Sequence, residues 1–64
     1  MNDRERQLQA LADIALDSAQ KLFRSAEALE EVEAGHAQQA LSLSDGLRRL
    51  GQDIEWDLAM ERKS

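Results

Sequence analysis

Residues 8–29 read LQALADIALDSAQKLFRSAEAL, and the spacing of their apolar side chains decides the fold. The apolar positions alternate steps of four and three residues, at Leu8, Ala12, Ala15, Ala19, Leu22, Ala26 and Leu29. This heptad rhythm is typical of a helix that packs against another helix. Ala12, Ala19 and Ala26 form a small set, whereas the other set is mostly leucine. Layers of alternating size let two helices approach closely and interdigitate.

Signals for helix ends flank this stretch on both sides. Asn2 can cap a helix, and Glu5 stands three residues later, as in a capping box. Towards the C-terminus the rhythm fails at Glu33 and His36, with Gly35 between them. The rhythm then resumes and predicts a core stripe on a second helix, at Ala40, Leu43, Leu47, Leu50, Ile54 and Leu58.

The favoured interpretation is a chain that turns near Gly35. Glycine can adopt the left-handed conformation that ends a helix. We therefore predict an all-α fold, an antiparallel two-helix hairpin that forms a single domain over residues 1–64. Its first helix covers about 3–33, its turn 34–37 and its second helix about 38–62.

Two other arrangements remain open at this point. The first helix could continue to 42–46, where Ser42 or Asp45 would cap the helix that follows. The chain could also form one uninterrupted coiled coil. Each of its three glycines would then cost about 1 kcal/mol in helix propensity.

The small size of the chain favours self-association. A 64-residue domain buries only about 60% of its unfolded surface, and such folds usually need disulfides, a metal or oligomerisation. The chain has no cysteine and only one histidine, His36, so disulfides and Cys/His metal sites are excluded within one chain. We expect a homodimeric four-helix bundle.

The apolar surface of the first helix supports the same expectation. Its apolar arc extends from Ile14 and Val32 on one edge to Leu16 and Phe23 on the other. An ordinary surface helix has an apolar stripe of roughly 100°, whereas this arc covers about 200°. One neighbouring helix cannot cover such an arc, but two neighbours can.

A second candidate contact surface surrounds the only tryptophan. Trp56 projects opposite the leucine stripe of the second helix, with Met60 one turn after it and Gln52 one turn before. A tryptophan near a methionine and a cation such as Arg49 is the composition of a binding hot spot. Alternatively, Trp56 lies over its own helix or packs on a second chain. The predicted partner-binding residues are Trp56, Met60, Arg49, Gln52, Leu16 and Phe23.

Charge distribution suggests a further, weaker surface. The net charge of −5 disfavours non-specific binding to nucleic acid. With a turn near residue 35, residues whose numbers add up to about 70 would lie side by side. Four cations would then form a basic waist that could bind RNA phosphates, at Lys21, Arg24, Arg48 and Arg49. The alternative is ordinary pairing along each helix, from Asp17 to Lys21 and from Asp45 to Arg49.

The turn end would be acidic under the same arrangement. No lysine or arginine occurs between residues 25 and 47. This segment contains four glutamates, at Glu27, Glu30, Glu31 and Glu33. The open end of the hairpin would instead hold Arg4, Arg6, Arg62 and Lys63.

The core pattern, the length and the central turn resemble the Rop family, plasmid-encoded helical hairpins that dimerise into a four-helix bundle and bind paired RNA loops. The resemblance implies the bundle fold and, as one possibility, an RNA-binding regulator. That family's RNA-binding face uses Lys, Asn, Phe and Gln on the first helix. The matching positions here hold other residues, namely Asp3, Ala10, Ile14, Ser18 and Ser25. This departure puts the RNA function in doubt.

Several classes of function are excluded or unsupported by the sequence. No Gly-rich phosphate loop or nucleophile elbow occurs, and a hairpin has no interior for a substrate pocket. We expect no enzymatic activity and no cofactor. No apolar run could span a membrane, and the N-terminal residues lack an apolar signal region, so we expect a cytoplasmic protein. A small interaction or regulatory module fits best, and a co-chaperone like those of type III secretion, working as a hetero-oligomer, is an alternative.

Overall fold

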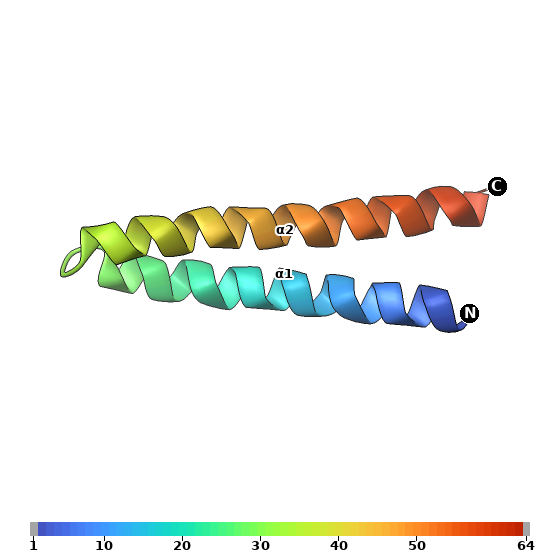
Figure 1. Cartoon of the computed structure of the whole chain (residues 1–64), viewed down its shortest axis with the longest axis horizontal. Coiled ribbons are helices and arrows are strands. Elements are labelled where there is room, and N and C mark those ends of the chain that lie inside the picture. The colour runs from blue at the N-terminus through green and yellow to red at the C-terminus, as the bar shows by residue number, and fades with distance from the viewer. Residues whose placement is uncertain (1, 64) are drawn as a thin grey trace.

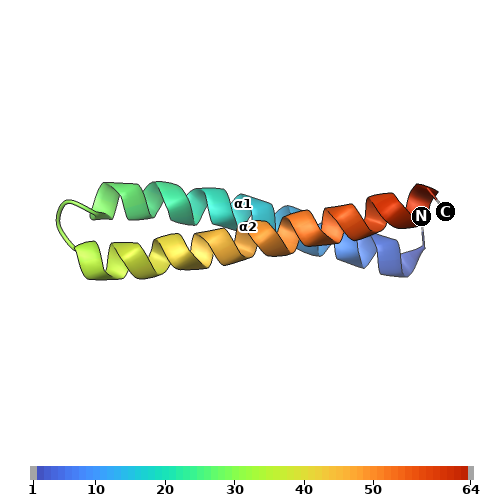
Figure 2. The same cartoon turned by 90° about the horizontal axis from the view of Figure 1, so that it is seen from above.

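Two long helices, α1 (Asp3–Leu29) and α2 (Ala34–Lys63), account for nearly all of this computed structural model, which describes residues 2–63. The helices run antiparallel and lie side by side (Figure 1). They cross at a shallow angle when seen from above (Figure 2). The turn lies at one end of a particle that measures 48 × 16 × 12 Å. The predicted all-α hairpin is therefore confirmed.

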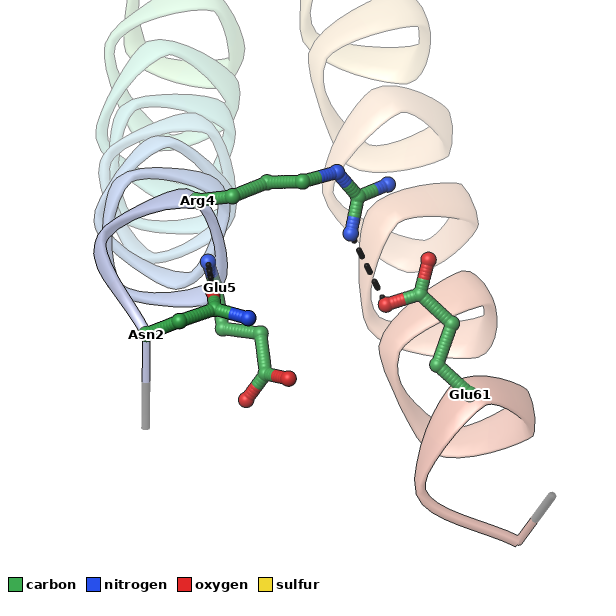
Figure 3. Close-up of polar contacts among 4 residues, drawn as sticks. All are labelled: Asn2, Arg4, Glu5 and Glu61. Atoms are coloured by element: carbon green, nitrogen blue, oxygen red, sulfur yellow. Dashed lines mark hydrogen bonds and ion pairs between the residues drawn. The ribbon is translucent and has the colours of Figure 1, made fainter.

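The start of α1 has the predicted Asn2 cap, without the return bond from the Glu5 side chain that would complete a capping box. The side-chain oxygen of Asn2 accepts a hydrogen bond from the backbone N–H of Glu5 at 2.8 Å (Figure 3). This bond satisfies one of the N–H groups that lack a partner in the first turn of a helix. Asp3 and Glu5 also place negative charge at the positive end of the helix dipole.

The turn lies at residues 30–33, four residues before the predicted position. Gly35 lies in the first turn of α2, and no residue among 2–63 has a positive φ. The N–H of Glu33 donates to the carbonyl of Leu29 at 2.9 Å, and the N–H of Ala37 donates to the carbonyl of Glu33 at 3.1 Å. These bonds reverse the chain without the predicted left-handed glycine. Residues 42–46 are helical, so the later break is also wrong.

The fully buried part of the contact between the helices consists mainly of alanine, and half-buried leucines such as Leu8 and Leu16 border it. The buried apolar residues are Ala12, Ala15, Ala19, Ala26, Ala37, Ile54 and Leu58. Within residues 2–63, Ile54 and Leu58 are therefore the only large apolar side chains in this buried set. Because alanine is short, the two helices can approach more closely than leucine-lined helices could.

The predicted core stripe on α2 is wrong at two of its positions. Leu43 and Leu50 keep 64% and 43% of their surface exposed, whereas Ser44 and Gly51, one residue later, are buried. A step of one residue turns a side chain by about 100° around the helix. The small residues at 44 and 51 face the alanines of α1, and this contact turns the two leucines away from it.

The helices approach each other closely at Gly51. A methyl group added at Gly51 would lie 2.5 Å from Cγ of Leu16 and 3.2 Å from the carbonyl oxygen of Ala12. Such distances are shorter than ordinary van der Waals contact, so only a hydrogen atom fits between the helices there. At Gly46, in contrast, an added methyl group would have no other atom within 4 Å.

A buried hydrogen bond between the helices fixes the position of α2 along α1. The hydroxyl of Ser44 donates to the backbone carbonyl of Ala19 at 2.7 Å. At the open end, Arg4 donates to Glu61 at 2.9 Å (Figure 3). The numbers of facing residues therefore add up to 63–65 in these two pairs. The predicted value of 70 is wrong, because α2 is shifted along α1 by five to seven residues.

Replacing Ser44 with alanine is expected to lower the free energy of unfolding by about 1 kcal/mol, because the hydrogen bond to Ala19 is lost. Urea unfolding followed by circular dichroism measures this change. Ser42→Ala is the matched control, since Ser42 is exposed on the same helix and reports the helix-propensity gain alone. Equal stability of the two variants would show that the bond contributes nothing.

Candidate protein-interaction surfaces

The hairpin presents three surfaces on which apolar side chains remain exposed. We call them the apolar face, the groove face and the outer side of α2. The apolar face contains Leu11, Ile14, Leu22, Leu43, Leu47 and Leu50. The groove face contains Leu16, Gln20, Phe23, Arg48 and Gln52. The outer side of α2 contains Arg49, Trp56 and Met60.

Side chains of both helices meet on the apolar face. Ser18, Ser25 and Leu22 line a shallow depression together with Leu47 of α2 and Lys21. Because both helices line this depression, the side of α1 that carries Ser18 and Leu22 and the side of α2 that carries Leu47 belong to one continuous surface.

Heptad spacing extends the apolar face along the hairpin. Leu11 and Ile14 lie seven residues before Ser18 and Lys21, so they occupy the same side of α1. Ile14 is 63% exposed. Leu43 and Leu50 flank Leu47 by one helical turn in each direction and extend the face along α2.

Charge is nearly absent from the apolar face. Over residues 7–32 and 36–54, the heptad positions of Leu11, Ile14, Leu22, Leu43 and Leu47 hold one charged residue, Lys21. Its ammonium group lies 2.9 Å from a carboxylate oxygen of Asp17. Charges border this region at Arg4, one heptad before Leu11, at Asp57, one heptad after Leu50, and at Asp53, one heptad after Gly46. A surface so poor in charge, contributed by two helices, is typical of the buried centre of a protein–protein interface.

Sequence reasoning found part of the apolar face and missed the rest. It placed Ile14 and Val32 on an edge of the wide arc, and both are exposed. It assigned Leu43 and Leu50 to the intrachain core and did not single out Leu11. The missed signal is the pair Ser44 and Gly51, which repeats with the same spacing of seven as the leucines.

The groove face brings together three of the predicted partner-binding residues. Leu16, Phe23 and Gln52 line one pocket, with Ala19, Gln20, Ser44 and Arg48. Leu16 is half-buried because it packs over Gly51, whereas Phe23 is exposed. The predicted flank of α1 therefore forms an amphipathic pocket with amide and guanidinium groups at its rim.

Trp56 lies on the outer side of α2, away from α1. It is 67% exposed and stands two residues before the buried Leu58, about 200° around the helix. Met60 is exposed one turn later, and the guanidinium of Arg49 lies 3.2 Å from Asp45 two turns earlier. Trp56 is thus not part of the hairpin core, and it lies on a different side of the molecule from Leu16 and Phe23.

The structure does not bring the four cations of the predicted basic waist together. Lys21 lines the depression on the apolar face, whereas Arg48 lines the pocket on the groove face. The register also places Lys21 level with residues 42–44 rather than with Arg48 and Arg49. Pairing along each helix is observed instead, from Lys21 to Asp17 and from Arg49 to Asp45.

An ion pair joins the two helices at the open end of the hairpin. The hydrogen bond from Arg4 to Glu61, and then the negative charge of Glu61, raise the pKa of Arg4 above its ordinary value. Both side chains are largely exposed, so the pair contributes little to stability. Over residues 2–63 no group of three or more acidic or histidine side chains is arranged to hold a metal ion. Within the same residues neither helix is long and apolar enough to cross a membrane.

Comparison with known proteins identifies no relative. No family model, no curated protein and no solved structure matches the chain.

Proposed function

We propose that this chain is a non-enzymatic protein–protein interaction module, of the adaptor, inhibitor or co-chaperone type, that acts as a self-associating helical bundle. One observation carries the proposal. Within residues 2–63 the hairpin buries two large apolar side chains, Ile54 and Leu58, and leaves nine exposed. The exposed set is Leu11, Ile14, Phe23, Leu29, Val32, Leu43, Leu50, Trp56 and Met60.

The energetic reason is the small intrachain core. Ordering the backbone costs roughly 1–2 kcal/mol per residue, and burying one Leu or Ile side chain returns only about 1.5–3 kcal/mol. The buried alanines between the helices supply little of this stabilisation, because each alanine side chain buries little apolar surface. A second copy that covers Leu11, Ile14, Leu43 and Leu50 would add the missing apolar burial, as oligomerisation does for many small folds.

Self-association through the apolar face would leave the other two surfaces available. Trp56 and Met60 lie on the outer side of α2, and Phe23 lies in the pocket of the groove face. Aromatic residues and methionine are enriched at protein interfaces. We propose these residues as the contacts for a different protein, the client of the bundle.

An RNA-binding role is the weaker candidate. The cations it would need lie on different faces, and Lys21 and Arg49 pair with aspartates on their own helices. An RNA contact would also weaken steeply with salt, whereas an apolar protein contact would not. The Rop-like architecture, the type III secretion-like co-chaperone role and the cytoplasmic location stay predictions from the sequence.

Solution mass is expected to equal twice the 7.2 kDa of one chain at micromolar concentration. The thermal midpoint is expected to fall on dilution, because dissociation and unfolding are then coupled. Light scattering and circular dichroism melts over a hundredfold range of concentration make the two measurements. A compact monomer that melts cooperatively at a concentration-independent temperature would contradict the proposal.

A further inference from the structure

We infer that the apolar face binds a second copy of this chain in an antiparallel arrangement, with the turn end of one hairpin against the open end of the other. This inference rests on the proposed self-association and adds its geometry. The two-fold axis would pass α1 at the level of Ser18 and α2 between Gly46 and Leu47. Helix α1 would then face α1 of the second copy, and α2 would face α2.

On α1, large and small side chains are arranged so that two copies related by a two-fold axis at Ser18 would fit each other. On the apolar face, Leu11, Ser18 and Ser25 follow one another at intervals of seven residues. A two-fold axis at Ser18 places Leu11 of each copy against Ser25 of the other. Ser18 and Ser25 line the shallow depression, so a leucine has a hollow to fill.

The positions of the exposed leucines on α2 indicate an axis at the same level of the hairpin. Leu43 and Leu50 lie at equal distances from the midpoint between Gly46 and Leu47, so they would face each other across the dimer. The intrachain register places Ser18 level with residues 45–47. A single two-fold axis therefore relates both α1 to α1 and α2 to α2 of the second copy.

The charges favour the antiparallel arrangement over the parallel one. The turn end carries Glu27, Glu30, Glu31 and Glu33, and within residues 2–63 none of them forms an ion pair. A parallel dimer would bring eight glutamates together, with no lysine or arginine between residues 25 and 47 to compensate.

The antiparallel dimer instead places the glutamates near cations of the second copy. Glu30 lies twelve residues after Ser18, and Arg6 lies twelve residues before it. Glu30 and Glu31 both lie in the turn, and Arg62, near the end of α2, is as many residues after the axis as Glu31 is before it. The open end also holds Asp3, Glu5, Asp57 and Glu61, so it is close to neutral. The antiparallel arrangement thus keeps two acidic turn ends apart and places each beside a near-neutral end, while the leucines between them supply the burial.

A single engineered cysteine tests the axis, because the chain has none of its own. Ser18→Cys is expected to form a disulfide-linked dimer under mild oxidation, since the two residues 18 would meet on the axis. Gln20→Cys, on the groove face, is the matched control and is expected to stay unlinked. Two cysteines whose Cα atoms are more than about 7 Å apart cannot form a bridge. Leu11→Cys mixed with Ser25→Cys is expected to link only as the mixed pair.

The outcomes separate the inference from the proposed function. A monomeric mass would overturn both. A dimeric mass in which Ser18→Cys links to Leu47→Cys, but not to itself, would overturn the antiparallel arrangement and keep the self-association.

Spin labels at Glu31→Cys give a second measurement at an exposed site of the turn. The antiparallel dimer is expected to separate them by a distance comparable with the 48 Å length of the hairpin. A short distance would indicate two turns side by side and would overturn the inference.

Discussion

Replacing Gly51 with leucine is expected to unfold the hairpin. The first carbon atom of the new side chain would already lie 2.5 Å from Leu16 and 3.2 Å from the carbonyl of Ala12. The remaining three carbon atoms have no space unless α1 and α2 separate, and separation would expose the buried alanines between the two helices. Overpacking costs about 1–3 kcal/mol or more, and a domain of this size rarely has more than about 3–5 kcal/mol to lose. Loss of the helical circular dichroism signal and of the cooperative melt would report the unfolding.

Two further variants make this prediction specific. Gly46→Leu introduces the same side chain at a position where its first carbon atom meets no neighbouring atom within 4 Å, and we expect the two helices to pack as in the parent. Helix propensity rises there by about 1 kcal/mol. Because Gly46 lies beside the proposed dimer axis, the comparison uses the helical signal and not the solution mass. The double variant Gly51→Ala with Leu16→Ala removes the side chain that the new methyl group would meet. It is expected to be more stable than Gly51→Ala alone. If Gly51→Leu melted like Gly46→Leu, the close approach of the helices would be wrong.

Replacing Leu50 with glutamate is expected to dissociate the dimer, and its thermal midpoint should fall as well because dissociation and unfolding are coupled. Leu50 points away from α1 and is 43% exposed, so the hairpin loses little when it changes. In the proposed dimer the same side chain is buried in each copy, and each leucine accounts for about 1.5–3 kcal/mol. Two such losses per dimer should raise Kd at least about a hundredfold. Sedimentation equilibrium of the parent and the variant measures this change.

Met60→Glu is the matched control for this experiment. Met60 is also an exposed apolar residue of α2, but it lies on the outer side rather than on the apolar face. We expect Met60→Glu to dimerise as the parent chain does. If Met60→Glu dissociated and Leu50→Glu did not, the self-associating surface would be the one around Trp56, and the apolar face would have to bind something else.

The rhythm of residues 8–29 was sufficient to predict two antiparallel helices and the alanines between them. The cap at Asn2 was also readable, because capping depends on residues close together in the sequence. The turn was placed four residues too late. Glycine was taken to end the helix, but Leu29 and Glu33 reverse the chain with ordinary backbone hydrogen bonds.

The face of α2 that meets α1 was decided only by the tertiary structure. The leucines at 43 and 50 and the small residues at 44 and 51 repeat with the same spacing, so periodicity alone cannot choose between them. The alanines of α1 make the choice, because close contact between the backbones leaves room for Ser44 and Gly51 but not for leucine. The hydrogen bond from Ser44 to Ala19 then sets the register. The sequence by itself therefore determined that the chain folds as paired helices, whereas contact between those helices decided which leucines remain exposed for another molecule.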